Sequence, residues 1–260
     1  MTFEKLERIF MKTVAFHTLG CKVNTYETEA MQQLMEAAGY RCVDFSEKAD
    51  VYIINTCSVT NIADRKSRQM LHRARKMNED AIVVAAGCYV ESAKEKIDED
   101  LSIDIIVGNN NKNEIVNIIN EYLQDKNENR FIIDINKNTE YEEFNISKIN
   151  DHTRAFIKVQ DGCNQFCSYC IIPFTRGRVR SRKMENIIDE VKSLSASGYK
   201  EIVLTGIHLS SYGVDFLDES YNKRMEKLTQ TEESDEEFVT KNELLCLIEN
   251  IANIEGIERV

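Results

Sequence analysis

The chain has 260 residues, 42% of them hydrophobic, and a formal net charge of −11. This length predicts about two domains, and the composition is typical of a soluble globular protein. No stretch is apolar enough to span a membrane, and the charged residues 1–12 lack the apolar core of a signal peptide. Eight cysteines without a secretory signal therefore indicate reduced, metal-binding thiols in a cytoplasmic protein rather than disulfides.

The first half of the chain alternates short apolar runs with helical patterns. The runs predict strands at residues 13–19, 51–55, 81–86 and 105–107, and a further strand at 131–135. Helices are expected at residues 25–38, at 62–77, from about residue 91, and at 113–123. This alternation predicts an α/β fold, in which an open parallel sheet carries helices on both faces.

Three cysteines occupy the same position relative to three of these strands. Cys21, Cys57 and Cys88 each lie just past the carboxyl end of a strand. Because the carboxyl ends of parallel strands share one sheet edge, we expect these cysteines to converge in space. Gly20 and Gly87 precede two of them and let the backbone approach a bulky inorganic group closely. A three-cysteine cluster site is favoured over packing, since buried thiols alone do not explain the shared position.

A second set of cysteines lies close together in the sequence. Cys163, Cys167 and Cys170 have C-x3-C-x2-C spacing, and three such thiolates can hold one iron–sulfur cubane with one iron left open. The alternatives are a zinc knuckle or three buried thiols. Zinc usually requires a fourth Cys or His nearby, and the next candidate, His208, is far along the chain. The last two cysteines lack either context and are expected to fill apolar space: Cys42 and Cys246.

The second half of the chain begins after a polar linker at residues 136–152. A strand at 154–160 leads into the cysteine loop, a helix at 184–196 follows, and a strand at 201–205 ends at Gly206. This order predicts the start of a parallel (β/α) barrel, whose sites lie at the strand carboxyl ends. Residues 215–241 are expected to be an acidic, mobile insertion, and 242–253 a helix. Two barrel units cannot close a barrel, so we expect a truncated chain.

The acidic net charge argues against a nucleic-acid partner, but the charge is unevenly distributed. Residues 174–183 carry five cations and no acid, and residues 62–77 carry six cations against Asp64 alone. A local basic patch is compatible with phosphate binding. The simpler interpretation of residues 62–77, a solvated helix face, is favoured on the sequence alone.

The motifs together resemble the radical-SAM methylthiotransferases. The resemblance is carried by TLGCKVNTYETE at residues 18–29, NTCSVT at 55–60, KSRQ at 66–69, AGCY at 86–89 and the segment 161–182. It covers the chain except for residues 1–10, which we interpret as a start-site extension, and the acidic insertion. LGCKVN at residues 19–24 and VT at residues 59–60 resemble the motifs of the branch that modifies threonylcarbamoyladenosine in tRNA. The other branches act on isopentenyladenosine in tRNA or on a ribosomal-protein aspartate.

This resemblance implies two 4Fe-4S clusters and S-adenosylmethionine (SAM) as cofactors. The cluster on Cys163, Cys167 and Cys170 would cleave SAM to a radical, and a cluster on the other three cysteines would hold the sulfur to be transferred. The implied product is a methylthio group at C2 of N6-threonylcarbamoyladenosine at position 37 of tRNA. Such chemistry depends on cofactors, since C2 is an unactivated aromatic carbon. A flavodoxin or ferredoxin is the implied reductant; the sulfur donor is unknown, and no membrane partner is expected.

The resemblance also suggests roles for individual residues. Tyr169 matches the motif aromatic expected beside the SAM adenine, with local packing as the alternative. Gly206 is a candidate contact of SAM or an ordinary turn glycine. Asn24, three residues past Cys21, is a candidate helix cap or a residue that supports the cluster ligands from behind. Three arginines are candidate contacts of phosphates or the SAM carboxylate, or structural residues: Arg176, Arg180 and Arg182.

The family pattern extends beyond this chain. Family members carry the rest of the barrel and a small all-β RNA-binding domain, which the 260 residues do not include. The predicted domains are therefore residues 13–135 and a partial radical-SAM domain at 153–260. We expect the isolated chain to be inactive alone. A non-catalytic iron–sulfur binding module is the competing function of a different class.

Overall fold

The computed structural model describes residues 12–93, 97, 99–126, 129–135, 137, 140–144, 154–216 and 242–260. Their contacts divide the chain into two compact units. The first comprises residues up to 138 with 142–146 and 165–177, and the second comprises 139–141, 147–164 and 178–260. The expected start-site extension and almost all of the acidic insertion lie outside the described residues.

The first unit contains a six-stranded sheet in which every neighbouring pair is parallel. The strand order is β2-β1-β3-β4-β5-β6. Its strands are β1 (Thr13–Thr18), β2 (Arg41–Val43), β3 (Val51–Thr56), β4 (Ile82–Gly87), β5 (Ile105–Val107) and β6 (Arg130–Phe131). The predicted open parallel sheet is confirmed, although the short edge strand β2 was not expected.

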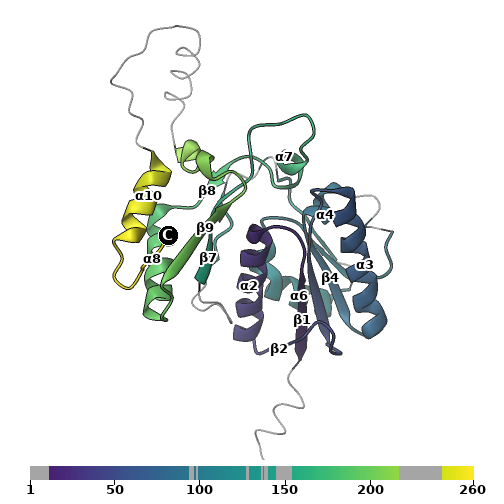
Figure 1. Cartoon of the computed structure of the whole chain (residues 1–260). Coiled ribbons are helices and arrows are strands. Elements are labelled where there is room, and N and C mark those ends of the chain that lie inside the picture. Colours follow the sequence, from purple (N-terminus) through teal and green to yellow (C-terminus); the bar gives the residue numbers. More distant parts are fainter. Residues whose placement is uncertain are drawn as a thin grey trace, which may run out of the picture. The chain divides into compact units, whose positions relative to one another are not determined.

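Helices cover both faces of this sheet (Figure 1). They are α2 (Lys22–Ala37), α3 (Asn61–Met77), α4 (Cys88–Ser92) and α6 (Ile115–Gln124), with the 3₁₀ turn η1 (Lys112–Glu114) before α6. Alternate strand residues enter two separate cores: Ile53 packs with α2 and α6, whereas Tyr52 packs with α3 and α4. Burial on both faces explains why these strands read as continuous apolar runs.

Two helices start earlier than the sequence pattern predicts. Helix α2 begins at Lys22 rather than residue 25, and Cys21 occupies its N-cap position. The prediction that Asn24 caps this helix is therefore wrong, because Asn24 lies inside the first turn. Helix α4 begins at Cys88. Both candidate ligands thus lie at helix N-termini, where the backbone N–H groups favour a thiolate.

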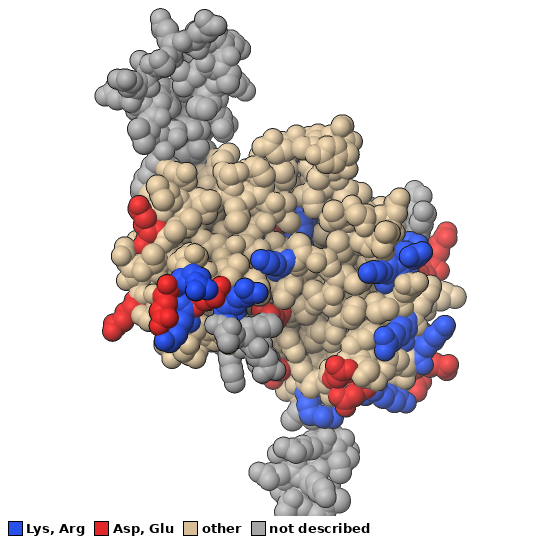
Figure 2. Space-filling view, viewed as in Figure 1, with Lys and Arg blue, Asp and Glu red and all other residues tan. Residues whose placement is uncertain are grey.

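Helix α3 carries the basic run noted in the sequence. Its buried residues are Ser67, Leu71 and Ala74, so the cations lie on the remaining surface. Figure 2 shows acidic side chains among the basic ones over this helix. Part of this charge is paired within the unit, since Arg75 bonds Asp104.

The second unit is built on β7 (Arg154–Asp161), which pairs in parallel with β9 (Glu201–Gly206) and antiparallel with β8 (Arg180–Ser181). Helix α8 (Met184–Ala196) connects β8 to β9, and α10 (Glu243–Ala252) packs on α8. After α10, Arg259 forms a parallel bridge with Glu201 of β9. This is the arrangement expected for the first units of a (β/α) barrel. None of the helices that the structure describes is long and apolar enough to cross a bilayer.

Candidate functional site

The three strand-end cysteines follow adjacent strands of the first unit. Cys21 follows β1, Cys57 follows β3 and Cys88 follows β4, and these three strands are neighbours in the sheet. The register aligns their ends, because Thr56 at the end of β3 pairs with Gly87 at the end of β4. Cys57 and Cys88 are 7% and 3% exposed, whereas Cys21 is exposed. The topology therefore brings all three to one sheet edge.

Two glycines leave space at this edge. Gly20 has φ +107°, and a Cβ there would lie 2.9 Å from both Cβ and Sγ of Cys57. Gly87 has φ +95°, and a Cβ there would lie 2.6 Å from Oδ1 of Asn55. Any other residue would be strained by the backbone conformation and would also displace its neighbour. The glycines thus let the Cys21 and Cys88 turns approach the β3 end closely.

Side-chain amides fix the strand ends to each other. Asn24 donates from Nδ2 to the carbonyls of Leu19 and Thr56, at 2.7 and 2.9 Å. Asn55 donates to the carbonyl of Asn24 at 3.0 Å, and the Thr56 hydroxyl donates to the Ala86 carbonyl at 2.5 Å. Asn24 therefore connects β1 to β3, the function it performs in place of the predicted cap.

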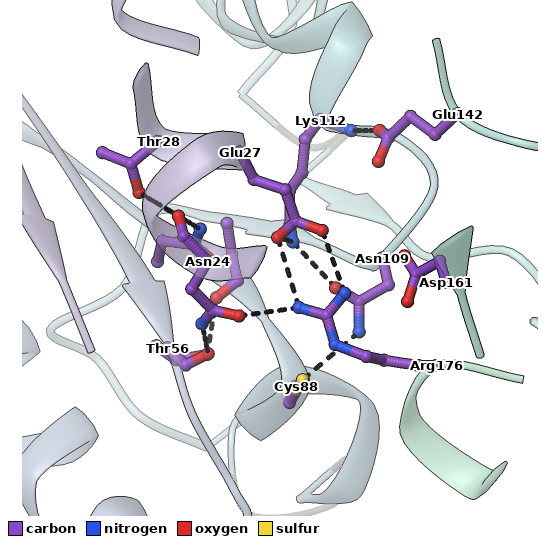
Figure 3. A network of polar contacts seen from close by, with 12 residues as sticks. Asn24, Glu27, Thr28, Thr56, Cys88, Asn109, Lys112, Glu142, Asp161 and Arg176 are labelled. Atoms are coloured by element: carbon purple, nitrogen blue, oxygen red, sulfur yellow. Dashed lines mark hydrogen bonds and ion pairs between the residues drawn. The ribbon is translucent and has the colours of Figure 1, made fainter. Parts of the chain in front are cut away.

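A buried group of charges lies beside this edge (Figure 3). Glu27 of α2 is ion-paired with Lys112 of η1 and, at 2.9 Å, with Arg176. The two cations are 0% and 1% exposed at their side chains. Arg176 also donates to Asn24 Oδ1 at 2.7 Å. The Glu27 carboxylate thus faces two cations in a buried region.

This charged group reaches the cysteines through amides. Asn109 accepts from Lys112 Nζ at 2.8 Å, and its Nδ2 lies 3.7 Å from Cys88 Sγ as a donor. Burial raises the pKa of the Cys57 thiol. The hydrogen bond from the Val59 amide and the charge of Arg176 lower this pKa, whereas the neighbouring Cys88 and Cys21 thiols raise it. These electrostatic effects on Cys57 are consistent with its lying near Cys21, Cys88 and Arg176.

The residues at this edge fit an iron–sulfur cluster. Three soft thiolate donors lie at helix N-termini or beside an N–H donor. Buried cations nearby can balance the negative charge of the thiolates, and the glycines leave room for a bulky inorganic group. Among the described residues, no group of three or more His, Cys, Asp or Glu side chains is placed to hold a single metal ion. A cubane differs from a single ion, since each thiolate binds a separate iron.

The second cysteine set lies in a short loop after β7. Cys163 is 9% exposed, Cys167 is exposed and Cys170 is half-buried. The backbone N–H of Cys170 donates to the Cys167 carbonyl at 2.9 Å, so these two residues form a turn. Tyr169 is 91% exposed. Its ring is therefore not packed in the interior, and its predicted contact with SAM stays a prediction.

Gly206 ends β9 at a crowded position. A Cβ there would lie 3.0 Å from Gln160 Oε1 and 3.1 Å from a Leu209 methyl carbon. Gln160 also accepts from the backbone N–H of His208 at 2.8 Å. Close packing within the second unit explains why a residue without a side chain occupies this position. A contact between Gly206 and SAM stays a prediction.

The three arginines proposed as substrate contacts are all buried against carboxylates. Arg176 pairs with Glu27, Arg182 lies 2.5 Å from Glu190, and Arg180 lies 3.9 Å from Asp161. Each is at most 1% exposed. Their observed contacts are structural, so a substrate contact stays a prediction that the geometry does not support.

Sequence reasoning missed three members of the buried charged group: Glu27, Lys112 and Asn109. The sequence did hold one indication that Asn109 belongs to the site: it follows β5 just as the cysteines follow their strands. Glu27 lies in the first half of α2, but a charge on a helix gives no sign of burial in the sequence.

Two family descriptions match the chain. "Uncharacterized protein family UPF0004" matches residues 13–108, and "Radical SAM superfamily" matches residues 157–251. The first match contains all three strand-end cysteines, and the second contains the C-x3-C-x2-C loop.

Curated relatives match both parts. "Threonylcarbamoyladenosine tRNA methylthiotransferase MtaB" of Bacillus subtilis is 46% identical over 84% of this chain and 48% of its own length. "tRNA-2-methylthio-N(6)-dimethylallyladenosine synthase" of Malacoplasma penetrans is 32% identical over 89% of this chain and 48% of its own length. The chain thus spans about half the length of these relatives.

A solved structure shares the fold. The radical S-adenosylmethionine methyltransferase TsrM from Kitasatospora setae aligns with a TM-score of 0.50 and 16% identity, over 76% of this chain and 48% of that chain. At this identity the likeness concerns the fold alone.

Proposed function

The chain belongs to the radical-SAM methylthiotransferases, and from this membership we propose that the protein adds a methylthio group to C2 of N6-threonylcarbamoyladenosine at position 37 of tRNA. Membership in this family implies SAM and a 4Fe-4S cluster as cofactors. The second cluster, the tRNA substrate, a flavodoxin or ferredoxin reductant and a cytoplasmic location are parts of the proposal.

The observation that carries the proposal is the presence of two separate cysteine sets. Bound clusters would supply electron transfer to SAM at Cys163, Cys167 and Cys170, and a sulfur-holding site at the strand-end cysteines. A chain needing only SAM cleavage would use the first set alone. The second set, at a sheet edge shaped by glycines, supports transfer of sulfur.

The chain's own residues supply position and charge at the sheet edge. Asn24 holds the turn after β1 against the end of β3, which fixes Cys21 relative to Cys57. Asn109 presents an N–H to the Cys88 sulfur, and hydrogen bonds to sulfur stabilise the thiolate. Lys112 and Arg176 offset the negative charge that gathers where three thiolates meet.

Nucleoside analysis of tRNA from a strain lacking the gene tests the proposal. We expect loss of the 2-methylthio form of threonylcarbamoyladenosine, while the 2-methylthio form of dimethylallyladenosine is retained. The matched control is the same strain with the gene restored, in which the lost nucleoside returns. Loss of the dimethylallyl form instead would contradict the proposed substrate and favour the activity named for the Malacoplasma penetrans relative.

A further inference from the structure

A pocket of about 560 Å³ adjoins the strand-end cysteines within the first unit. Its wall includes Ser58 and Tyr89, which directly follow Cys57 and Cys88 in the sequence. Asp64 and Arg68 of α3 form another part of the wall. The volume lies in the range of small-molecule sites and is large enough for part of a nucleoside.

Arg68 is held in this wall by an aromatic ring. Its guanidinium carbon lies 5.8 Å from the centre of the Tyr89 ring, and Nη1 donates to the Tyr89 hydroxyl at 3.4 Å. Tyr89 is itself 2% exposed, so it is a fixed support. A guanidinium has five N–H donors, and Tyr89 is its only hydrogen-bond partner among the described residues. The remaining donors are free to bind a carboxylate in a bidentate manner.

Asp64 adds an acceptor one turn away on the same helix face. Its Oδ1 is buried and has no hydrogen-bond partner among the described residues. A buried acceptor without a donor is costly, so turning the carboxylate, which lines the pocket, toward a ligand N–H or O–H would be favoured. Asp64 and Arg68 are four residues apart, which places the acceptor and the cation side by side in the pocket wall.

This pair of groups distinguishes between ligand classes. Glu91 also lines the pocket, so two carboxylates make it unfavourable for a phosphate, which presents acceptors on every side. An amino-acid group fits better, because it carries a carboxylate for Arg68 and N–H or hydroxyl donors for Asp64. A threonylcarbamoyl group has all of these, whereas a dimethylallyl group has none.

We propose that this pocket binds the threonylcarbamoyl group of the target adenosine, with Arg68 binding its carboxylate and Asp64 accepting from its N–H or hydroxyl. The proposal rests on the proposed function and adds the residues that select the substrate. A dimethylallyl group would leave both charged side chains desolvated and unpaired, which is the strongest form of discrimination that a polar site provides.

Binding of two free nucleosides to the protein tests this assignment, using N6-threonylcarbamoyladenosine and N6-dimethylallyladenosine as probes in calorimetric titrations. Arg68→Leu is expected to weaken binding of the first by about tenfold to a hundredfold, the usual loss for a charged hydrogen bond. Binding of the second is expected to be unchanged or tighter. Arg68→Lys is expected to restore part of the affinity, since it keeps the charge without the bidentate geometry.

Arg65→Leu is the matched control, because Arg65 is an exposed cation on the same helix outside the pocket. It is expected to leave both affinities unchanged, and thermal melts of all variants show that the fold is retained. If the unaltered protein prefers threonylcarbamoyladenosine and Arg68→Leu keeps that preference, the assignment of Arg68 is overturned while the proposed substrate stands. If the unaltered protein prefers dimethylallyladenosine, both the pocket assignment and the proposed substrate fail.

Discussion

The two cysteine sets are built in opposite ways. Cys163, Cys167 and Cys170 lie within eight residues of one another, so a single loop brings them together. The strand-end cysteines are each more than thirty residues apart and meet only because β1, β3 and β4 are adjacent and parallel. The first set depends on local chain geometry, and the second depends on the whole sheet.

This difference predicts different sensitivities. A site that the fold assembles should respond to changes in buried residues that never contact a ligand, because those residues hold the strand ends in place. A loop site should respond mainly to changes within the loop. Substitutions in the buried group around Glu27, or at the glycines before Cys21 and Cys88, should therefore affect the sheet-edge site and spare the loop site.

The largest effect is expected at Glu27. Glu27→Gln removes the carboxylate that the buried Lys112 and Arg176 share, which is expected to cost about 3–5 kcal/mol of unfolding free energy. Lys112→Met is expected to cost much less, because it leaves the Arg176–Glu27 pair neutral. Urea denaturation of the metal-free protein measures both. Equal losses from the two substitutions would contradict this account of the charge balance.

A smaller effect, specific to the sheet edge, is expected at Gly20. Gly20→Ala and Gly39→Ala both place a side chain at positive φ, at +107° and +88°, and each is expected to cost about 1–2 kcal/mol. Only Gly20→Ala also displaces Cys57, since nothing lies within 4 Å of a Cβ at Gly39. We therefore expect iron loss from the reconstituted protein with Gly20→Ala alone. Iron retained in both variants would show that the close approach at Gly20 is unimportant.

The smallest effect concerns thiol reactivity in the metal-free protein. Exposed Cys167 is expected to react with iodoacetamide faster than Cys57, since burial raises the Cys57 pKa, lowers its thiolate fraction and shields its sulfur from the reagent. Cys42, whose pKa burial raises to about 12, is the slow internal reference. Mass spectrometry of timed samples gives the order in which the cysteines are alkylated. Similar rates for Cys57 and Cys167 would contradict the expected difference between the buried sheet-edge thiol and the exposed loop thiol.

Much of the sheet edge was predictable from the sequence. Strand positions follow from apolar runs, and parallel pairing then places Cys21, Cys57 and Cys88 together. The buried charged group was not predictable in the same way. Its members are 85 residues apart for Lys112–Glu27 and 149 for Arg176–Glu27, and no local pattern marks a charge as buried.

The error at Asn24 has a related cause. An Asn shortly after a strand is a common cap, but the helix begins two residues earlier, at Lys22. Its side chain then faces the ends of β1 and β3 and bonds their carbonyls. Helix starts are poorly defined by sequence, and here a shift of three residues in the predicted start changed the interpretation of the residue.

Iron and labile sulfide content after anaerobic reconstitution tests the central claim that the strand-end cysteines hold their own cluster. The comparison is between the unaltered protein and a variant with Cys21, Cys57 and Cys88 all changed to Ala. We expect about eight irons per chain, falling to about four in the variant. About four irons in both proteins would mean that the loop cysteines alone bind a cluster, and would contradict the account of the sheet edge.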